Sequence, residues 1–359
     1  MAHNFLSGAF LETPAWHKLG IVVDTAKNST EMSTLAGMDW ETLKVQSEYQ
    51  WEGQYRLSGN YQSLVRSDNG VFLGMVQNVY QPYQNRDAFD FTDSLVESGD
   101  IVYESAGVLG KGEKIWVLCR MPKSIEVTQD DVLHNYIFIM NHHDGKGSIN
   151  VGPTNVRIVC QNTWNAALAS GRRGEIFKIQ HSSKTEQNLN QAKQILQEVN
   201  KLVDFAGNQY RELAHTQITR NQFESYANDV VEFMYPKKEE EVKPNYSGMN
   251  LLDAAIEETQ LAKLPAKEAK RHAANRMLEM VLDNYDNEKN TLPGIQGTAW
   301  SAYNSVTEYT NHGMKYRGSN KAVDNERYKS ENRLTSILGG TAANVNEYAY
   351  QQAVTRFKN

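Results

Sequence analysis

Residues 101–120 read IVYESAGVLGKGEKIWVLCR, and this stretch decides how the N-terminal half of the chain folds. Two apolar runs, Ile101–Leu109 and Ile115–Arg120, flank the turn Gly110-Lys111-Gly112. Glycine adopts the positive φ angles that tight turns need, and short apolar runs bounded by such turns are typical of strands. We therefore expect a β-hairpin here, within an antiparallel sheet.

The sequence on both sides of this hairpin is also strand-like, from about Lys44 to Cys160. Asn69-Gly70 and Asp144-Gly145 are hairpin-turn dipeptides, and a short helix is predicted over Arg86–Glu97. An alternation of apolar or small with polar residues predicts a strand with one half-buried face, formed by Val45, Ser47, Tyr49 and Trp51.

A strand that leads directly into a helix is predicted near the end of this half. Val156–Cys160 contains three β-branched apolar residues, Val156, Ile158 and Val159, which indicates a strand. Asn162 is a residue type that often begins helices, so we expect a helix over Thr163–Ser170. Trp164 would then lie on that helix.

After Gly174 the apolar spacing changes to three- and four-residue steps, which predicts helices. Leu189–Leu213 forms one long amphipathic helix, and Thr219 with Gln222 is a capping box that begins the next. The predicted fold class is α+β, an N-terminal antiparallel sheet with a few helices followed by a largely helical C-terminal half. The predicted boundaries are 1–180 for the α+β domain, 181–236 for a long helix and helical hairpin, 237–250 for a charged linker and 251–359 for a helical region.

The charge of the 359-residue chain is unevenly distributed. The formal net charge of −6 excludes an obligate polycation such as a histone, although it does not exclude a local basic groove. Residues 1–150 carry net −8, whereas residues 151–180 and 291–359 each carry net +3. Cys119 and Cys160 are too few for a disulfide framework, and no leader or membrane-spanning segment is evident. We expect a soluble protein in the cytoplasm of a bacterial host.

Common catalytic motifs are absent from the sequence, which contains no P-loop, H-E-x-x-H or G-x-S-x-G. We therefore predict no catalytic activity and no cofactor. His142 and His143 could be metal ligands, although adjacent strand residues point to opposite faces and a solvated turn explains them better. Asp87, Asp90 and Asp93 are spaced three residues apart, so they share one face of a helix. Their carboxylates could bind a metal ion, or they could simply complement the positive end of the helix dipole at its N-terminus.

Two short basic segments are candidate nucleic-acid contacts, because arginine matches phosphate and aromatic rings stack on unpaired bases. The alternative interpretation is that Trp164 packs in the core and that the basic residues are ordinary surface charges. The first segment contributes Arg157, Trp164, Arg172, Arg173 and Lys178, and the second contributes Lys315, Arg317 and Arg333.

Four ordered segments of the chain match motifs of a known family. They are Pro14–Gly20, Val156–Thr163, Gly297–Trp300 with Asn304–Tyr309 and His312, and Glu331–Leu334 with Gly339-Gly340. These segments resemble the phage/plasmid-like family of unknown function, and the resemblance implies a mobile-element origin. It brings no catalytic residues, and Lys18 departs from the family pattern by standing where a small residue is usual.

The predicted architecture is also similar, at the level of fold, to phage single-strand annealing proteins of the Red-beta and RecT type. Those proteins assemble as rings or filaments and hold DNA in a basic groove without metal catalysis. Three hypotheses follow: a homo-oligomeric protein that binds single-stranded DNA in recombination or replication, a protein that binds a host or phage protein and modulates host defence, and an enzyme with an unrecognised site.

Overall fold

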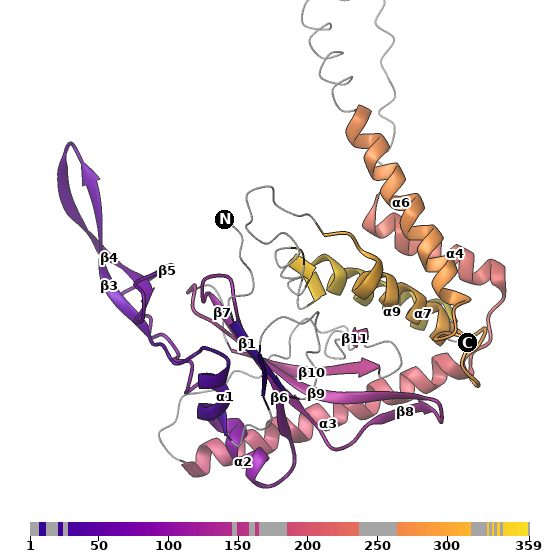
Figure 1. Ribbon diagram of the computed structural model, residues 1–359, viewed down its shortest axis with the longest axis horizontal. Helices are drawn as coiled ribbons and strands as arrows, with labels where there is room; N and C mark the ends of the chain where they lie inside the picture. The colour runs from indigo at the N-terminus through magenta and orange to yellow at the C-terminus, as the bar shows by residue number, and fades with distance from the viewer. Residues whose placement is uncertain are drawn as a thin grey trace, which may run out of the picture. The chain divides into compact units, whose positions relative to one another are not determined.

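The computed structural model divides the chain into two compact units (Figure 1). One unit comprises residues 1–209 and 315–343, and the other comprises residues 210–314 and 344–359. The structure describes residues 7–11, 21–23, 28–145, 149–157, 162–164, 185–236, 264–316, 329, 332–333, 336–337 and 340–357.

The first unit is built on a sheet in the strand order β11-β10-β9-β7-β6-β1-β2, with β8 paired to β9. All these pairs are antiparallel except β1 with β2, so the predicted α+β class is confirmed. The strands are β1 (Ser7–Leu11), β2 (Ile21–Val23), β6 (Val102–Leu109), β7 (Lys114–Arg120), β8 (Ile125–Thr128), β9 (Asp131–His142), β10 (Asn150–Arg157) and β11 (Asn162–Trp164).

The predicted hairpin of residues 101–120 is present as β6 and β7. Val108 pairs with Ile115, and Gly110 and Gly112 in the connecting turn both have positive φ. Four consecutive residues of β7, Trp116 to Cys119, are at most 1% exposed, so both faces of the sheet are covered at this strand. This explains why the strand is a continuous apolar run and does not alternate.

Two short helices belong to this unit, α1 (Ser29–Leu35) and α2 (Asp90–Glu97). The predicted helix over Arg86–Glu97 is therefore present from Asp90 onward, after a turn-rich segment. Phe91 and Leu95 of α2 are buried, as is Met32 of α1.

A second, three-stranded sheet of this unit has the order β3-β4-β5. Its strands are β3 (Thr42–Trp51), β4 (Gln54–Arg66) and β5 (Phe72–Gln77), and Figure 1 shows β3 and β4 as an extended two-stranded ribbon. The predicted strand is present, but the prediction of one half-buried face is wrong. Val45, Tyr49 and Trp51 are 40%, 52% and 57% exposed, and Ser47 is the buried member of the set.

The predicted helix over Thr163–Ser170 is wrong at its start. Asn162–Trp164 forms β11, which pairs with β10 through Val156 and Thr163. Both residues are β-branched and favour a strand, and Asn162 pairs with Arg157 within the sheet, so it does not cap a helix.

The long helix predicted from Leu189–Leu213 is confirmed as α3 (Thr185–His215), and the division between the two units falls inside it. The next helix, α4 (Arg220–Met234), begins at the predicted capping box. The Thr219 side chain accepts from the Gln222 backbone N–H, and the Gln222 side chain accepts from the Thr219 N–H.

The described part of the second unit is helical and packs around α7 (Ala299–Glu308), whose ten residues are all buried. Tyr210 lies against Trp300, with ring centroids 4.9 Å apart, and the Tyr226 hydroxyl donates to the Ala349 carbonyl at 3.0 Å. The other helices are α6 (Leu264–Tyr285), the π-helix η2 (Tyr309–Gly313) and α9 (Thr341–Phe357).

Candidate nucleic-acid interface

The first predicted basic segment is described only in part. Arg157 ends β10, where it pairs with Asn162, and Trp164 ends β11, where it pairs with Asn155. The antiparallel pairing therefore places Arg157 and Trp164 on adjacent strands at the two ends of a three-residue ladder, so the two residues are not directly paired. Three further predicted contacts of this segment, Arg172, Arg173 and Lys178, lie outside the described residues.

Two predicted residues of the second basic segment are described, and Arg317 is not. Lys315 is exposed, whereas Arg333 is half-buried. Tyr316 connects the two ends of the segment, because its side chain hydrogen-bonds with Ser336 and lies close enough to Arg333 for their charges to interact. Burial lowers the pKa of the Arg333 guanidinium, and the neighbouring Tyr316 partly offsets this effect.

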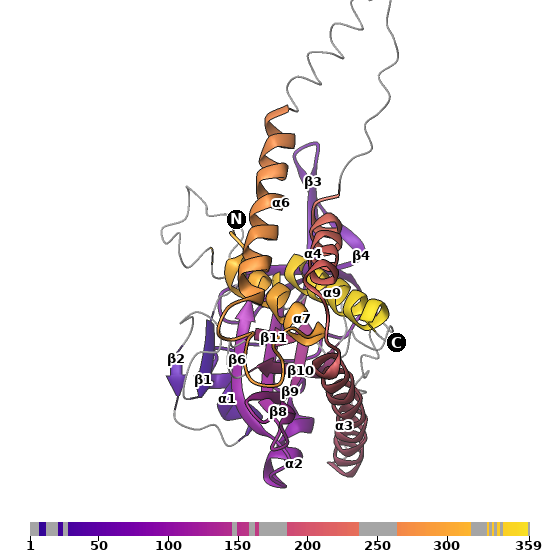
Figure 2. The ribbon, with the colours of Figure 1, turned by 90° about the vertical axis from the view of Figure 1, so that its right-hand side faces the viewer.

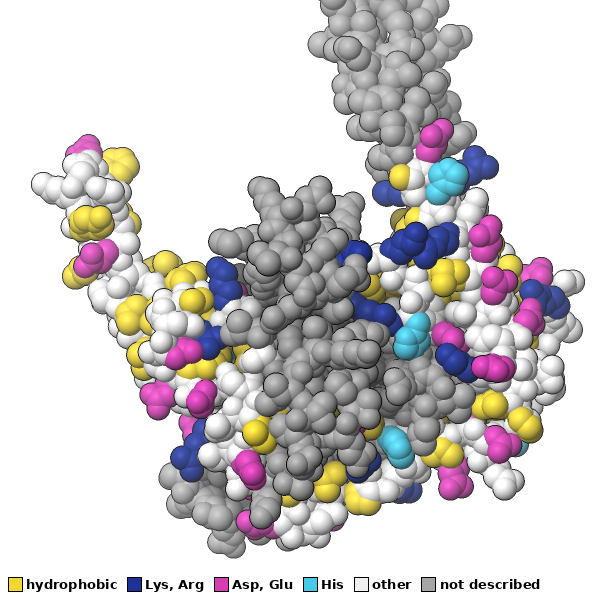
Figure 3. Space-filling view, viewed as in Figure 1, with side chains coloured by type: hydrophobic (Ala, Val, Ile, Leu, Met, Phe, Trp, Pro, Cys, Tyr) yellow, Lys and Arg dark blue, Asp and Glu magenta, His cyan; other side chains and the backbone are white. Residues whose placement is uncertain are grey.

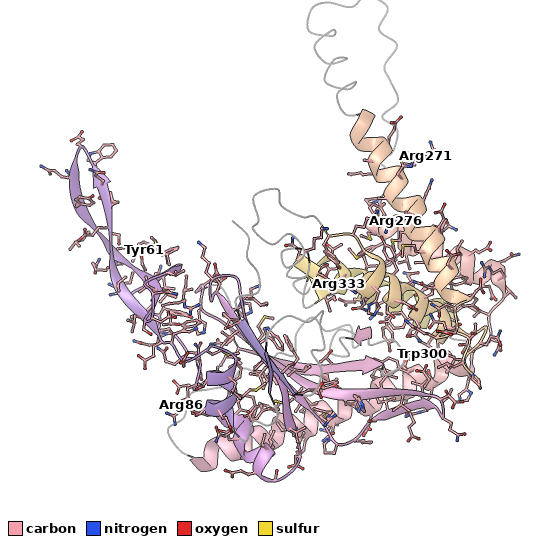
Figure 4. The ribbon with its side chains drawn as sticks, in the orientation of Figure 1. Tyr61, Arg86, Arg271, Arg276, Trp300 and Arg333 are labelled. Carbon is pink, nitrogen blue, oxygen red and sulfur yellow. The ribbon has the colours of Figure 1, made fainter. Side chains whose placement is uncertain are left out.

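A third basic surface, which the charge pattern did not predict, lies on α6 between Lys270 and Arg276. Lys270, Arg271 and His272 are exposed, and Arg276 is half-buried. Figure 4 labels Arg271 and Arg276 on this helix, and Figure 3 shows a group of basic side chains there. We call Lys270, Arg271, His272 and Arg276 the α6 basic surface.

The packing of α6 explains why these residues are accessible. In the C-terminal half of the helix a stripe at four-residue steps is buried: Met277, Val281 and Tyr285 are 0%, 0% and 7% exposed. Lys270 is seven residues before Met277 and therefore continues the same stripe, yet it is exposed. The N-terminal half extends beyond the neighbouring helices α4 and α7, as Figures 1 and 2 show.

Other cations of the second unit are held by carboxylates. Arg220 donates to Glu224 at 3.0 Å and to Asp286 at 2.6 Å, and Arg356 pairs with Asp229. Lys289 donates to Glu308 at 3.2 Å. By contrast, Lys270, Arg271 and Arg276 form no ion pair within the described part of the chain. Their charges are therefore available for an anionic ligand.

The sequence contains a signal for this surface. Between Lys263 and Arg276 there are five Lys or Arg residues and one acidic residue, Glu268. Charge summed over residues 181–290, which hold 14 basic and 18 acidic side chains, conceals this cluster. A shorter window along the predicted helix would have identified it.

The acidic candidates of α2 connect elements of the fold. The Asp93 carboxylate accepts from the Ser29 N–H at 2.6 Å, the Ser29 hydroxyl at 2.8 Å and the Tyr103 hydroxyl at 2.7 Å. Asp90 accepts a further, longer bond from Ser29, and its burial raises the pKa of its carboxyl. Asp93, a residue of α2, therefore links this helix to the N-terminus of α1 through Ser29 and to β6 through Tyr103.

The preference for a solvated turn is wrong for His143, the second candidate ligand, because this residue lies in the core and is 1% exposed. Its Nδ1 lies 2.9 Å from the Thr42 hydroxyl, and its ring meets the edge of Trp40 at 5.2 Å between centroids. Burial lowers the pKa of His143 to about 4, so the ring is neutral at pH 7. No group of three or more His, Cys, Asp or Glu side chains in the described ranges is arranged to hold a metal ion.

One cavity of about 290 Å³ lies at an end of the larger sheet. Ser124 and His134 hydrogen-bond to each other in its wall at 3.1 Å, and Arg120 pairs with Glu104 at 3.4 Å. Burial lowers the pKa of His134, and the Arg120 charge adds to this effect. The remaining lining residues are Ile101, Val102, Met121 and Pro122.

The comparisons with known proteins give one match. No curated protein and no solved structure matches the chain. Among the helices that the structure describes, none has the length and apolar character of a membrane-spanning segment. The family model described as Domain of unknown function (DUF932) matches residues 72–335, which is more than half of the chain. The match begins at the first residue of β5 and includes all of α6. The chain therefore belongs to the DUF932 family.

Proposed function

We propose that this protein binds nucleic acid through phosphate contacts and catalyses no reaction. The observation that carries the proposal is the α6 basic surface, whose lysine and arginines have no carboxylate partner within the described residues. Lysine and arginine side chains on an accessible surface bind phosphates and release counterions, and this electrostatic contribution dominates non-specific binding. A chain with net charge −6 needs such a local concentration of positive charge to bind a polyanion.

The proposal extends to the class of nucleic acid and its biological setting. Single-stranded DNA in phage or plasmid recombination or replication is the expected ligand, and its support is the sequence resemblance described above. A cytoplasmic location in a bacterial host and a homo-oligomeric state belong to the same proposal. Arg157, Trp164, Lys315 and Arg333 are further contacts in this proposal, together with Arg172, Arg173, Lys178 and Arg317.

The test is a fluorescence-anisotropy titration with a labelled 30-nucleotide single strand at low salt. The variant Lys270→Gln/Arg271→Gln removes two unpaired charges from α6. The matched control, Lys123→Gln/Lys201→Gln, removes two exposed lysines that pair with Asp204 and Glu198.

We expect the α6 variant to bind about tenfold or more weakly, since each lost phosphate contact removes counterion release. The control should retain affinity within about twofold, because its lysines are already neutralised by carboxylates. Absence of binding by the wild-type protein, or equal losses in both variants, would refute the proposal.

A second candidate function is binding of a host or phage protein, including modulation of host defence. The observation that favours it is the group of large apolar side chains exposed on β3, β4 and β5, among them Trp51 and Tyr55 at 57% and 74% exposure. Exposed apolar patches commonly mark protein interfaces. Affinity capture from infected cells that returns no stoichiometric partner would count against this function.

A further inference from the structure

The three-stranded sheet β3-β4-β5 carries an apolar face that is open to solvent. Its register aligns Val45 with Ser63 and Met75, and Leu43 with Val65 and Phe72, so these residues share one face. The large apolar residues of this face are 40–54% exposed; they are Leu43, Val45, Tyr61, Phe72 and Met75. We call them the β-arm face, and Figure 4 labels Tyr61 on it.

The other face of the same sheet is already covered. Leu64 is 0% exposed and Val76 is 6% exposed. The backbone of Gly74 lies so close to the Asp144 carbonyl that a side-chain carbon at Gly74 would clash with it. An antiparallel sheet with one covered face usually presents polar residues on the other. Here the second face is apolar as well, which is typical of the middle layer of a larger packing arrangement.

The apolar surface continues along the β3–β4 ribbon. Tyr49, Trp51, Tyr55 and Leu57 are 52%, 57%, 74% and 61% exposed. The register places Tyr49 and Trp51 on the face of Val45, whereas Tyr55 and Leu57 lie on the opposite face of the ribbon. At about 200 Å² per aromatic side chain, Tyr49, Trp51, Tyr61 and Phe72 present about 400 Å². With the aliphatic residues of the β-arm face the apolar area is about 600 Å², which is more than the non-polar part of the roughly 800 Å² that each partner buries in a standard stable interface.

The charges of the ribbon favour a second copy of this chain over a polyanion. Glu48, Glu52 and Arg56 are exposed and form no ion pair within the described residues, so the tip of the ribbon, residues 48–57, carries a net charge of −1. At the base of the ribbon, Lys44 donates to the Asn78 and Tyr80 carbonyls and Arg66 pairs with Asp68. Phosphates of nucleic acid or of an acidic membrane would be repelled by the two carboxylates. In a two-fold arrangement, by contrast, Arg56 of each copy can meet a glutamate of the other.

We propose that two copies of this protein associate through their β-arm faces, with the two sheets packed face to face. Such sheets lie about 10 Å apart and interdigitate their side chains. A two-fold interface uses the same patch on both copies, and a flat face of medium-sized apolar side chains is suited to this. The proposal uses none of the residues of the α6 basic surface.

The test measures the mass of the full chain by light scattering and sedimentation from about 1 to 100 µM. We expect the wild-type mass to rise to twice 40.7 kDa. Val45→Lys/Met75→Lys places two charges in the centre of the β-arm face, and we expect it to weaken association about a hundredfold. The control Gln194→Lys/Gln197→Lys adds the same charge at exposed positions of α3 and should behave as wild type.

Circular dichroism and thermal unfolding check that each variant folds. Should Val45→Lys/Met75→Lys unfold, Tyr49→Ser/Trp51→Ser provides a second test, since both side chains are more than half exposed. We expect about tenfold weaker association for it. A wild-type mass of 40.7 kDa at 100 µM, or a dimer that survives in every folded β-arm variant, would overturn the proposal. So would a monomeric wild-type protein whose β-arm face binds a host or phage protein, or β-arm variants that lose oligonucleotide or vesicle binding at unchanged mass.

Failure of this proposal is distinguishable from failure of nucleic-acid binding. Lys270→Gln/Arg271→Gln changes the α6 basic surface alone, and we expect it to leave the mass of the protein unchanged. For the β-arm variants we expect the opposite result: the dimer is lost, and the charges of the α6 basic surface are unchanged.

Discussion

Acidification should destabilise the first unit through a single buried imidazole, that of His143. The ring is 1% exposed, its Nδ1 contacts the Thr42 hydroxyl at 2.9 Å, and its Nε2 has no hydrogen-bond partner in the described structure. Burial lowers its pKa from 6.5 to about 4. Because the unfolded chain binds the proton more readily, the neutral ring contributes stability above pH 6.5, and this contribution is lost as the pH falls towards 4.

The magnitude follows from the difference between the two pKa values. A shift of about 2.5 units corresponds to about 3 kcal/mol, of which about 2 kcal/mol is already lost at pH 5. His143→Gln cannot titrate and loses the contact with the Trp40 ring, which costs about 1 kcal/mol at pH 7. The variant should therefore be less stable than wild type at pH 7 and more stable at pH 5.

Urea unfolding of both proteins from pH 7.5 to pH 4 measures this crossover. Groups other than His143 titrate in both proteins, so the difference between their stabilities isolates the imidazole. His142→Gln is the matched control, because burial lowers the pKa of the partly buried His142 by less than that of His143, and its curve should keep most of the wild-type dependence on pH. Parallel curves for wild type and His143→Gln would refute the reasoning.

Three further substitutions test the packing, each by urea unfolding at pH 7. Thr219→Ala removes the bond that the Thr219 hydroxyl accepts from the Gln222 N–H and should cost about 1 kcal/mol, whereas an unchanged midpoint would mean that this bond contributes nothing. Phe223→Ala deletes a fully buried ring stacked 3.8 Å from Tyr285 and should cost about 3 kcal/mol, and a loss below about 1 kcal/mol would contradict that packing. Gly74→Ala introduces a clash with the Asp144 carbonyl and should cost about 1–3 kcal/mol, so a neutral result would show that this close approach is absent.

Features encoded by a few neighbouring residues could be predicted from the sequence. The β6–β7 hairpin depends on glycines at the turn, and the start of α4 depends on Thr219 and Gln222. Both are local hydrogen-bonding or backbone requirements, which a short segment satisfies by itself. The long helix α3 was predictable for a similar reason, since its apolar spacing persists over many turns.

Features that depend on distant parts of the chain could not be predicted in this way. The alternation through Val45 and Trp51 indicates a strand, but burial of either face depends on what packs against it. Asn162 is typical of a helix start, yet Thr163 pairs with Val156 in the sheet because a neighbouring strand is available.

For the candidate nucleic-acid interface, the sequence could predict that basic residues are present but not which of them are accessible. Basic residues near 157 and 315 were evident in the sequence, whereas the accessibility of Lys270 and Arg271 depends on where the packed part of α6 ends. Neither the half-buried state of Arg333 nor its proximity to Tyr316 follows from a charge pattern.

The salt dependence of binding to a single-stranded oligonucleotide tests the central claim most directly. The logarithm of the association constant should fall linearly with the logarithm of salt concentration, by about 0.7 per phosphate contact. For Lys270→Gln/Arg271→Gln the slope should be shallower by about 1.4, and for Lys123→Gln/Lys201→Gln it should equal that of wild type. A slope that is the same in wild type and in the α6 variant would contradict the account.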